Sequence, residues 1–292
     1  MKVKIAGAPI SWGVCEVENW GHQMSPERVF GEMASLGLTG TEFGPLGFLP
    51  VEPKQRAAVL AELGMQATGG FFPVVLHVSS EDPMRKVEAE LDAYEAAGAN
   101  VLVIAAEQPG GNYNAKRPEI SSEEWAVLLG NLQRIDDYAR SRGITATVHP
   151  HVGTMIETEA DILRILEGTS VGITFDTGHM FIGGTDPVQF SKDYADRVKH
   201  VHLKDVRLDL ARKVQSGELT YYQACVQHMY TAVGSGDVDI RAIMTNLINA
   251  GYSGWFCLEQ DNIITEEPAE GEGPYADAKK SVEFINEVAA SL

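Results

Sequence analysis

At six places along the chain, histidine or acidic residues directly follow a run of apolar residues. Imidazole nitrogens and carboxylate oxygens bind divalent metal ions, and the same groups act as general acids and bases. The positions are Glu42, Glu107, His149-Pro-His151, Asp176-Thr-Gly-His179, His202-Leu-Lys204-Asp205 and Glu259. These residue types predict a reaction centre, provided that the fold brings the positions together.

The apolar runs before these positions have the length and the β-branched composition of buried strands. Eight such runs begin at Val3, Leu38, Met65, Asn100, Ile144, Val171, Val198 and Gly254. Segments with helical periodicity separate them, and one of these opens with the capping box Ser121-x-x-Glu124. A doubly wound open sheet is the competing fold, but no G-x-G-x-x-G follows the first strand. The pattern predicts a (β/α)8 TIM barrel that forms a single domain over residues 1–292.

One connection is longer than the others. Residues 207–236 follow the seventh strand and contain Tyr221, Tyr222 and Tyr230, whereas ordinary connections between a strand and its helix have about 2–6 residues. We expect an extended segment that either closes over the site as a lid or packs on a neighbouring chain.

The mouth of the predicted barrel should collect the polar residues, because active sites of this fold lie at the C-terminal strand ends. Alternation along the strands directs Asp176, Glu259, His200, His202 and Lys204 inward. Converging carboxylates and imidazoles would repel and desolvate one another without a positive charge among them. A divalent cation supplies that charge, and mixed nitrogen and oxygen ligation suits Mn²⁺, Co²⁺, Fe²⁺ or Zn²⁺ better than Ca²⁺.

Other polar residues allow simpler interpretations. His200 lies one layer deeper than His202 and is expected to be structural, as are three histidines in loops, His22, His77 and His228. Glu42 and Glu107 either cap the following helix or contact substrate. Lys204 and Arg207 are either solvated surface charges or contacts for substrate oxygens.

Composition excludes several classes of protein. The 292 residues include 23 Lys and Arg against 41 Asp and Glu, so the net charge is −18. Such a charge disfavours nucleic acid and anionic membranes as partners. Three widely spaced cysteines predict no disulfide framework, and no apolar run is long enough to span a membrane, so we expect a cytoplasmic protein.

Several phrases of the sequence resemble a known superfamily. They are FDTGH at 175–179, HVHLKDVR at 200–207, GSGDVD at 234–239 and GYSGWFCLEQD at 251–261. They are similar to motifs of the xylose isomerase-like sugar isomerases and epimerases. Within that superfamily the sequence most resembles the inosose dehydratase group, through TEFGPLGFLP at 41–50, HPHVGTMIET at 149–158 and SGELTYYQA at 216–224.

The resemblance implies one divalent metal ion held by His149, Asp176, His202 and Glu259. Mn²⁺ or Co²⁺ is the expected ion, with Zn²⁺ and Fe²⁺ as alternatives. In the epimerases a Glu-Pro pair occupies the fifth-strand position, where this chain has His149 and Pro150. That departure weakens the case for an epimerase that uses two glutamates as bases.

The resemblance also implies the chemistry, namely dehydration of a cyclic polyol ketone such as 2-keto-myo-inositol (scyllo-inosose). His151, His179 and Glu259 are the implied catalytic residues, and Glu42, Glu107, Lys204 and Arg207 are candidate substrate contacts. A metal-dependent keto-sugar isomerase or epimerase is the alternative, and a sugar-binding barrel and a metal-dependent endonuclease fit less well. A homo-oligomer is possible in each case.

Overall fold

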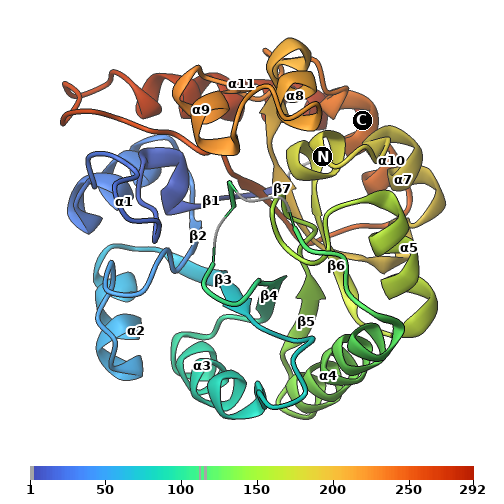
Figure 1. The fold of residues 1–292 in the computed structure, drawn as a ribbon. Coiled ribbons are helices and arrows are strands. Elements are labelled where there is room, and N and C mark those ends of the chain that lie inside the picture. Colours follow the sequence, from blue (N-terminus) through green and yellow to red (C-terminus); the bar gives the residue numbers. More distant parts are fainter. Residues whose placement is uncertain (1–2, 112, 115–116) are drawn as a thin grey trace.

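The computed structural model describes residues 3–111, 113–114 and 117–292. Eight parallel strands close into a barrel in the order β1-β10-β7-β6-β5-β4-β3-β2, with helices around it (Figure 1). The barrel strands are β1 Lys4–Gly7, β2 Gly40–Glu42, β3 Gln66–Val74, β4 Val101–Ala106, β5 Thr145–Val148, β6 Gly172–Asp176, β7 Val198–Leu203 and β10 Trp255–Leu258. All eight predicted strands are present, and the predicted (β/α)8 barrel is confirmed.

The helices begin and end largely at the residues that the sequence indicates. They are α1 Pro26–Ser35, α2 Pro53–Glu62, α3 Met84–Ala97, α4 Ser122–Ser141, α5 Glu159–Gly168, α6 Thr177–Ile182, α7 Pro187–Asp193, α8 Leu208–Gln215, α9 Tyr221–Val226, α10 Ile240–Asn249 and α11 Pro274–Ala290. The predicted capping box is formed at α4, where Ser121 and Glu124 each accept the other's backbone N–H. Among the described residues, no helix is both long and apolar enough to cross a membrane.

The first strand is shorter than its apolar run. The strand ends at Gly7, and Pro9–Trp12 forms a 3-10 helix. Proline has no N–H to donate to a neighbouring strand, but it fits the first position of a helix. The chain therefore turns inward over the barrel mouth at Pro9.

The long connection after β7 is folded rather than irregular. It contains α8 and α9, and β9 (Tyr230–Thr231) pairs antiparallel with β8 (Asp205–Val206). Tyr222 of α9 packs edge-on against Trp20, with 5.7 Å between ring centroids, and its N–H donates to Asn114 Oδ1. The segment 207–236 therefore packs against other parts of its own chain that surround the barrel mouth.

Two register shifts determine which polar side chains meet. Between Ile173 and Thr174 of β6, the paired residue on β7 advances from Val198 to His200, so Asp176 lies beside His202. Without the shift Asp176 would pair with Val201, which faces the helices. A β-bulge changes which face a residue occupies, so this bulge is what places a carboxylate and an imidazole together.

A second shift lies between β2 and β3. Thr41 pairs with Ala67, but Glu42 pairs with Gly69. A Cβ atom on Gly69 would lie 2.3 Å from the carbonyl oxygen of Val101, so only glycine fits this close approach of two strands. Gly69 thus allows β3 to approach β4 closely at the residue that pairs with Glu42.

Replacing Gly69 should destabilise the barrel. We expect Gly69→Ala to lower the free energy of unfolding by about 1–3 kcal/mol, because the added methyl group meets backbone that cannot move aside. Gly31→Ala is the matched control, since a Cβ there meets no atom within 4 Å and alanine favours the helical conformation of α1. Urea unfolding of both variants measures the difference, and equal stability of the two would contradict this account of Gly69.

Candidate active site and metal centre

A cavity of about 310 Å³ opens at the C-terminal ends of the barrel strands. Its walls are mostly apolar and come from residues 8–10, 14–20, 43–49 and 71–73. Polar and charged side chains also line it, namely Glu16, Glu42, Arg56, Glu90, Tyr113, His151, Tyr221, Glu259 and Asp261. An apolar cleft with a few convergent polar groups is typical of a small-molecule site.

Four side chains that the sequence indicates as metal ligands meet at this end of the barrel. Donor atoms of His149, Asp176, His202 and Glu259 all lie within 4.8 Å of one another. His149 Nε2 lies 3.1 Å from His202 Nδ1 and 3.3 Å from Asp176 Oδ2, and Glu259 Oε2 lies 2.6 Å from His202 Nδ1. Donors that share one ion at about 2.0–2.2 Å have separations of this order.

Two oxygens in this group test whether a cation fits. Asp176 Oδ2 and Glu259 Oε2 are buried and have no hydrogen-bond partner, although nitrogen atoms lie close to both. A buried carboxylate oxygen without a partner is costly, and a bound cation removes that cost. The residues present therefore fit a divalent metal ion.

Local structure fixes the other oxygen of Asp176. Its Oδ1 accepts the backbone N–H groups of Gly178 and His179, at 2.9 and 2.7 Å, and so caps the N-terminus of α6. Burial raises the pKa of Asp176, but the opposing effect of Lys204 and His179 is larger. The net pKa of Asp176 therefore lies well below its usual value. Asp176 is therefore an anion that presents Oδ2 to the other donors.

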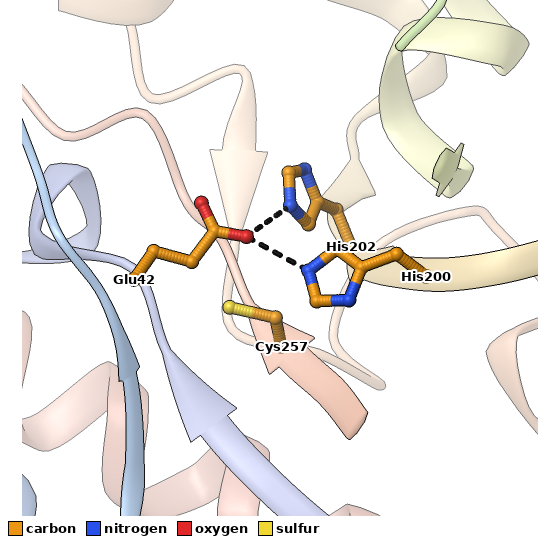
Figure 2. Close-up of side chains that lie close together, drawn as sticks. All are labelled: Glu42, His200, His202 and Cys257. Carbon is orange, nitrogen blue, oxygen red and sulfur yellow. Dashed lines mark hydrogen bonds and ion pairs between the residues drawn. The ribbon is translucent and has the colours of Figure 1, made fainter. Parts of the chain in front are cut away.

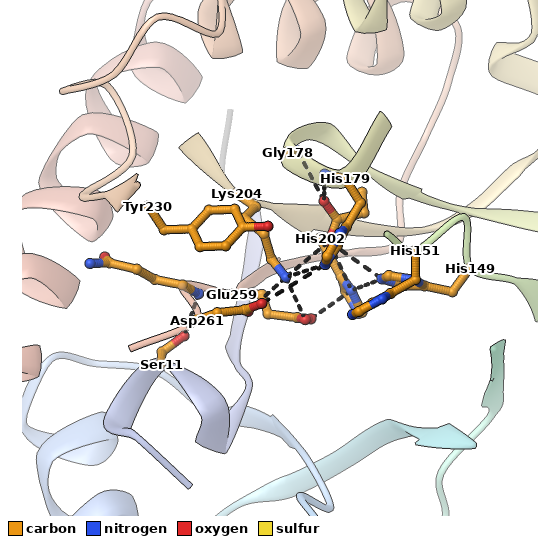
Figure 3. Close-up of polar contacts among 12 residues, drawn as sticks. Ser11, His149, His151, Gly178, His179, His202, Lys204, Tyr230, Glu259 and Asp261 are labelled. Atoms are coloured by element: carbon orange, nitrogen blue, oxygen red, sulfur yellow. Dashed lines mark hydrogen bonds and ion pairs between the residues drawn. The ribbon is translucent and has the colours of Figure 1, made fainter. Parts of the chain in front are cut away.

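Lys204 lies deeper than the sequence indicates. Its Nζ is 2.7 Å from Asp261 Oδ1, 3.0 Å from Glu259 Oε1 and 3.0 Å from His179 Nε2 (Figure 3). Burial lowers the pKa of Lys204, but the carboxylates outweigh that effect and hold its pKa well above normal. Lys204 is thus a buried cation that compensates carboxylates, and it is not among the residues that line the cavity.

His151 and His179 lie side by side, with 3.8 Å between their ring centroids. His151 Nδ1 donates to the Val152 carbonyl at 2.8 Å, so the lone pair is on Nε2. Burial, together with His149 and Lys204, lowers the pKa of His151 to about 3. His151 lines the cavity as a neutral imidazole that can accept a proton, whereas His179 lies behind it.

Glu42 occupies the floor of the cavity beside His200, His202 and Cys257 (Figure 2). Its Oε1 lies 2.8 Å from Nε2 of both His200 and His202. Burial raises the pKa of Glu42, but the two imidazoles outweigh it, so the net pKa is well below the usual value. His200 therefore has a structural contact, as the sequence indicates.

The structure brings neither Glu107 nor Arg207 to the cavity, although both are predicted substrate contacts. Arg207 lies at the start of α8, half exposed, with its Nε 3.7 Å from Asp209. Glu107 follows β4 and is partly buried, and burial and the nearby Glu16 raise its pKa. Their proposed role in binding stays a prediction.

Asp261 and Tyr221 line the cavity, although the sequence patterns did not predict either of them as a site residue. Asp261 accepts hydrogen bonds from Lys204 and from the Tyr221 hydroxyl. The alternation that points Glu259 inward applies equally two residues later, so Asp261 could have been found from the sequence. Tyr221 comes from the long segment 207–236, and its position depends on how that segment packs.

Comparisons with known proteins identify the family and the fold. The chain matches the family described as the xylose isomerase-like TIM barrel over residues 30–288. It is 30% identical to a protein named inosose dehydratase from Geobacillus thermodenitrificans (strain NG80-2), over 98% of this chain and 97% of that protein.

Solved structures with the same fold include an IOLI protein with a binding zinc atom and an L-ribulose 3-epimerase. The TM-scores are 0.73 and 0.71, the sequence identities are 12% and 16%, and the alignments cover 99% of this chain in both cases and 99% and 95% of the other chains. With its barrel, its donor cluster and its match over most of the sequence, the chain belongs to the xylose isomerase-like TIM barrel family.

Proposed function

We propose that this protein is a metal-dependent hydro-lyase that removes water from a cyclic polyol ketone, with 2-keto-myo-inositol (scyllo-inosose) as substrate. The observation that carries the proposal is the cluster of four buried donors beside a neutral His151 at the edge of the cavity. The similarity to a protein named inosose dehydratase over nearly the whole length supports the choice of substrate.

A divalent ion at His149, Asp176, His202 and Glu259 would polarise a ketone and stabilise the negative charge that develops when the α-proton leaves. We propose Mn²⁺ or Co²⁺ because two imidazoles and two carboxylates form a mixed donor set. Zn²⁺ and Fe²⁺ accept the same donors.

His151 is the residue best placed to move the proton. It lines the cavity, and its Nδ1 proton is held by the Val152 carbonyl, which leaves Nε2 with the lone pair. In the proposed reaction Nε2 takes the proton from the carbon next to the ketone. The bond between the β-carbon and its hydroxyl group then breaks, and the hydroxyl takes up the proton now carried by His151 and departs as water. The electron pair left by the α-proton forms the carbon–carbon double bond. His179, packed against His151, keeps the ring oriented.

The apolar walls and the few cations at the mouth suit an uncharged substrate. Lys204 is already engaged by carboxylates, and Arg207 lies outside the cavity. Arg56 does line the cavity, but its Nε donates to the Pro50 carbonyl and its Nη1 lies 3.9 Å from Glu90. A sugar phosphate would need free Lys or Arg groups around its phosphate. A neutral polyol, by contrast, needs hydroxyl partners, which Glu16, Tyr113, Tyr221 and Asp261 supply.

The substrate proposal is tested with the Mn²⁺-loaded protein and 2-keto-myo-inositol. We expect diketone absorbance to rise with loss of one water per substrate, activity to disappear after chelation, and Mn²⁺ to restore it. A panel of ketohexoses in deuterated water is the control. If the inosose stays unchanged and a ketohexose takes up deuterium and yields a new sugar, the protein is an isomerase or epimerase instead.

The role of His151 is tested with His151→Asn, which keeps a polar side chain of similar size but removes the base. We expect kcat to fall by about 10²–10⁴, as is typical for loss of a general base, with metal content unchanged. His228→Asn is the matched control, because His228 is exposed and has a φ of 57° that asparagine tolerates. A variant at position 151 with full kcat would remove His151 from the mechanism.

The metal centre is tested with Asp176→Asn. The amide oxygen can still cap α6, but the NH₂ group that replaces Oδ2 is a poor metal ligand. We therefore expect metal affinity to fall more than about 100-fold, which exceeds the loss usual for a residue that only orients a ligand. Asp186→Asn is the control, since Asp186 caps α7 in the same way, by accepting from Val188 and Gln189. Metal content after dialysis, measured by mass spectrometry, decides the outcome, and retention of one ion per chain in Asp176→Asn would exclude this centre.

A further inference from the structure

Glu42 makes an unusual pair of contacts for a residue at the floor of a substrate cavity. It comes from β2, and its Oε1 reaches across the barrel to Nε2 of His200 and His202 on β7, at 2.8 Å in both cases. Glu42 is 3% exposed, and the two imidazoles and Cys257 beside it are buried as well. One carboxylate oxygen therefore accepts two hydrogen bonds from buried imidazoles.

The contact determines which nitrogen of His202 carries a proton. A carboxylate only accepts, so His202 Nε2 must donate, and the proton is held on that side of the ring. The other nitrogen, Nδ1, lies 2.6 Å from Glu259 Oε2, 3.1 Å from His149 Nε2 and 3.6 Å from Asp176 Oδ2. Nδ1 faces the other three donors, so it is the nitrogen that would give up its proton and present a lone pair when a metal ion binds, while Nε2 keeps its proton against Glu42.

We propose that Glu42 is a positioning residue of the metal centre, which fixes the tautomer and the ring orientation of His202, rather than a contact for substrate. The inference rests on the proposed function, because it assumes that His202 binds a metal ion. His200 donates to the same oxygen and so holds Glu42 in place from the layer below.

The backbone supports this role. The register shift between β2 and β3 lies at Glu42, and the Glu42 side chain reaches from β2 to β7. A carboxylate that orients the outer nitrogen of a ligating histidine commonly contributes about 10–100-fold in metal affinity. A second metal ion among Glu42, His200, His202 and Cys257 is the competing interpretation, but it would have to replace both short hydrogen bonds.

The test compares Mn²⁺ binding to Glu42→Gln and to the wild-type protein. We expect one ion per chain in both, with the dissociation constant raised about 10–100-fold in the variant and KM for the substrate unchanged at saturating Mn²⁺. Glu32→Gln is the matched control, because Glu32 is also a buried glutamate that accepts two side-chain hydrogen bonds, from Trp12 and Arg28. Its Mn²⁺ affinity should stay within about twofold of wild type.

The outcomes separate the inference from the proposed function. Equal Mn²⁺ affinity of Glu42→Gln and wild type overturns the inference, and so does a raised KM with unchanged affinity, which would make Glu42 a substrate contact. Two ions in the wild type and one in the variant overturn it in favour of a second metal site. A wild-type protein that binds no Mn²⁺, Co²⁺, Zn²⁺ or Fe²⁺ contradicts the proposed function itself.

A measurement on the wild type covers the case in which Glu42→Gln does not fold. Long-range nitrogen–proton NMR of the Zn²⁺-loaded, ¹⁵N-histidine-labelled protein should find the His202 proton on Nε2 and a shifted Nδ1. A proton on Nδ1 with Zn²⁺ bound would overturn the inference without any variant.

Discussion

Burial of charge at one end of the barrel is the constraint on which this structure depends. Asp176, Glu259, Asp261 and Glu42 are all largely shielded from water, and Lys204 lies among three of them with its side chain fully buried. Desolvated carboxylates so close together repel one another strongly unless positive charge and hydrogen bonds compensate them. Lys204 supplies one positive charge, and the unpartnered oxygens of Asp176 and Glu259 mark the place for another.

The barrel meets this constraint through its geometry. Alternating side chains on parallel strands point His200, His202 and Lys204 to one interior, and a bulge in β7 places His202 beside Asp176. Asp176 and His202 stand on strands, and His149 and Glu259 directly follow the ends of β5 and β10, so the position of each donor follows from the barrel backbone. A site held in this way is preorganised for its ion, which is how protein metal centres gain affinity and selectivity.

The segments above the barrel complete the site in a different way. Tyr221 of α9 lines the cavity and donates to Asp261, while its neighbour Tyr222 packs on Trp20 from the N-terminal part of the chain. The contact between Tyr222 and Trp20 joins parts of the chain about 200 residues apart in sequence. Tyr221 and Trp20 both line the cavity, so the packing of the segment 207–236 shapes the wall of the site.

The sequence by itself determined the eight strands and the inward direction of Asp176, His202 and Glu259. It also determined that the candidate site lies at the C-terminal ends of the strands. These features follow from local rules, since alternation and helix caps depend on neighbouring residues only. Tertiary structure alone decided that Glu42 contacts His202, that Lys204 is buried among carboxylates, and that Arg207 lies away from the cavity. Those outcomes depend on register shifts between strands, on the reach of long side chains and on the packing of the segment 207–236, and no local pattern encodes them.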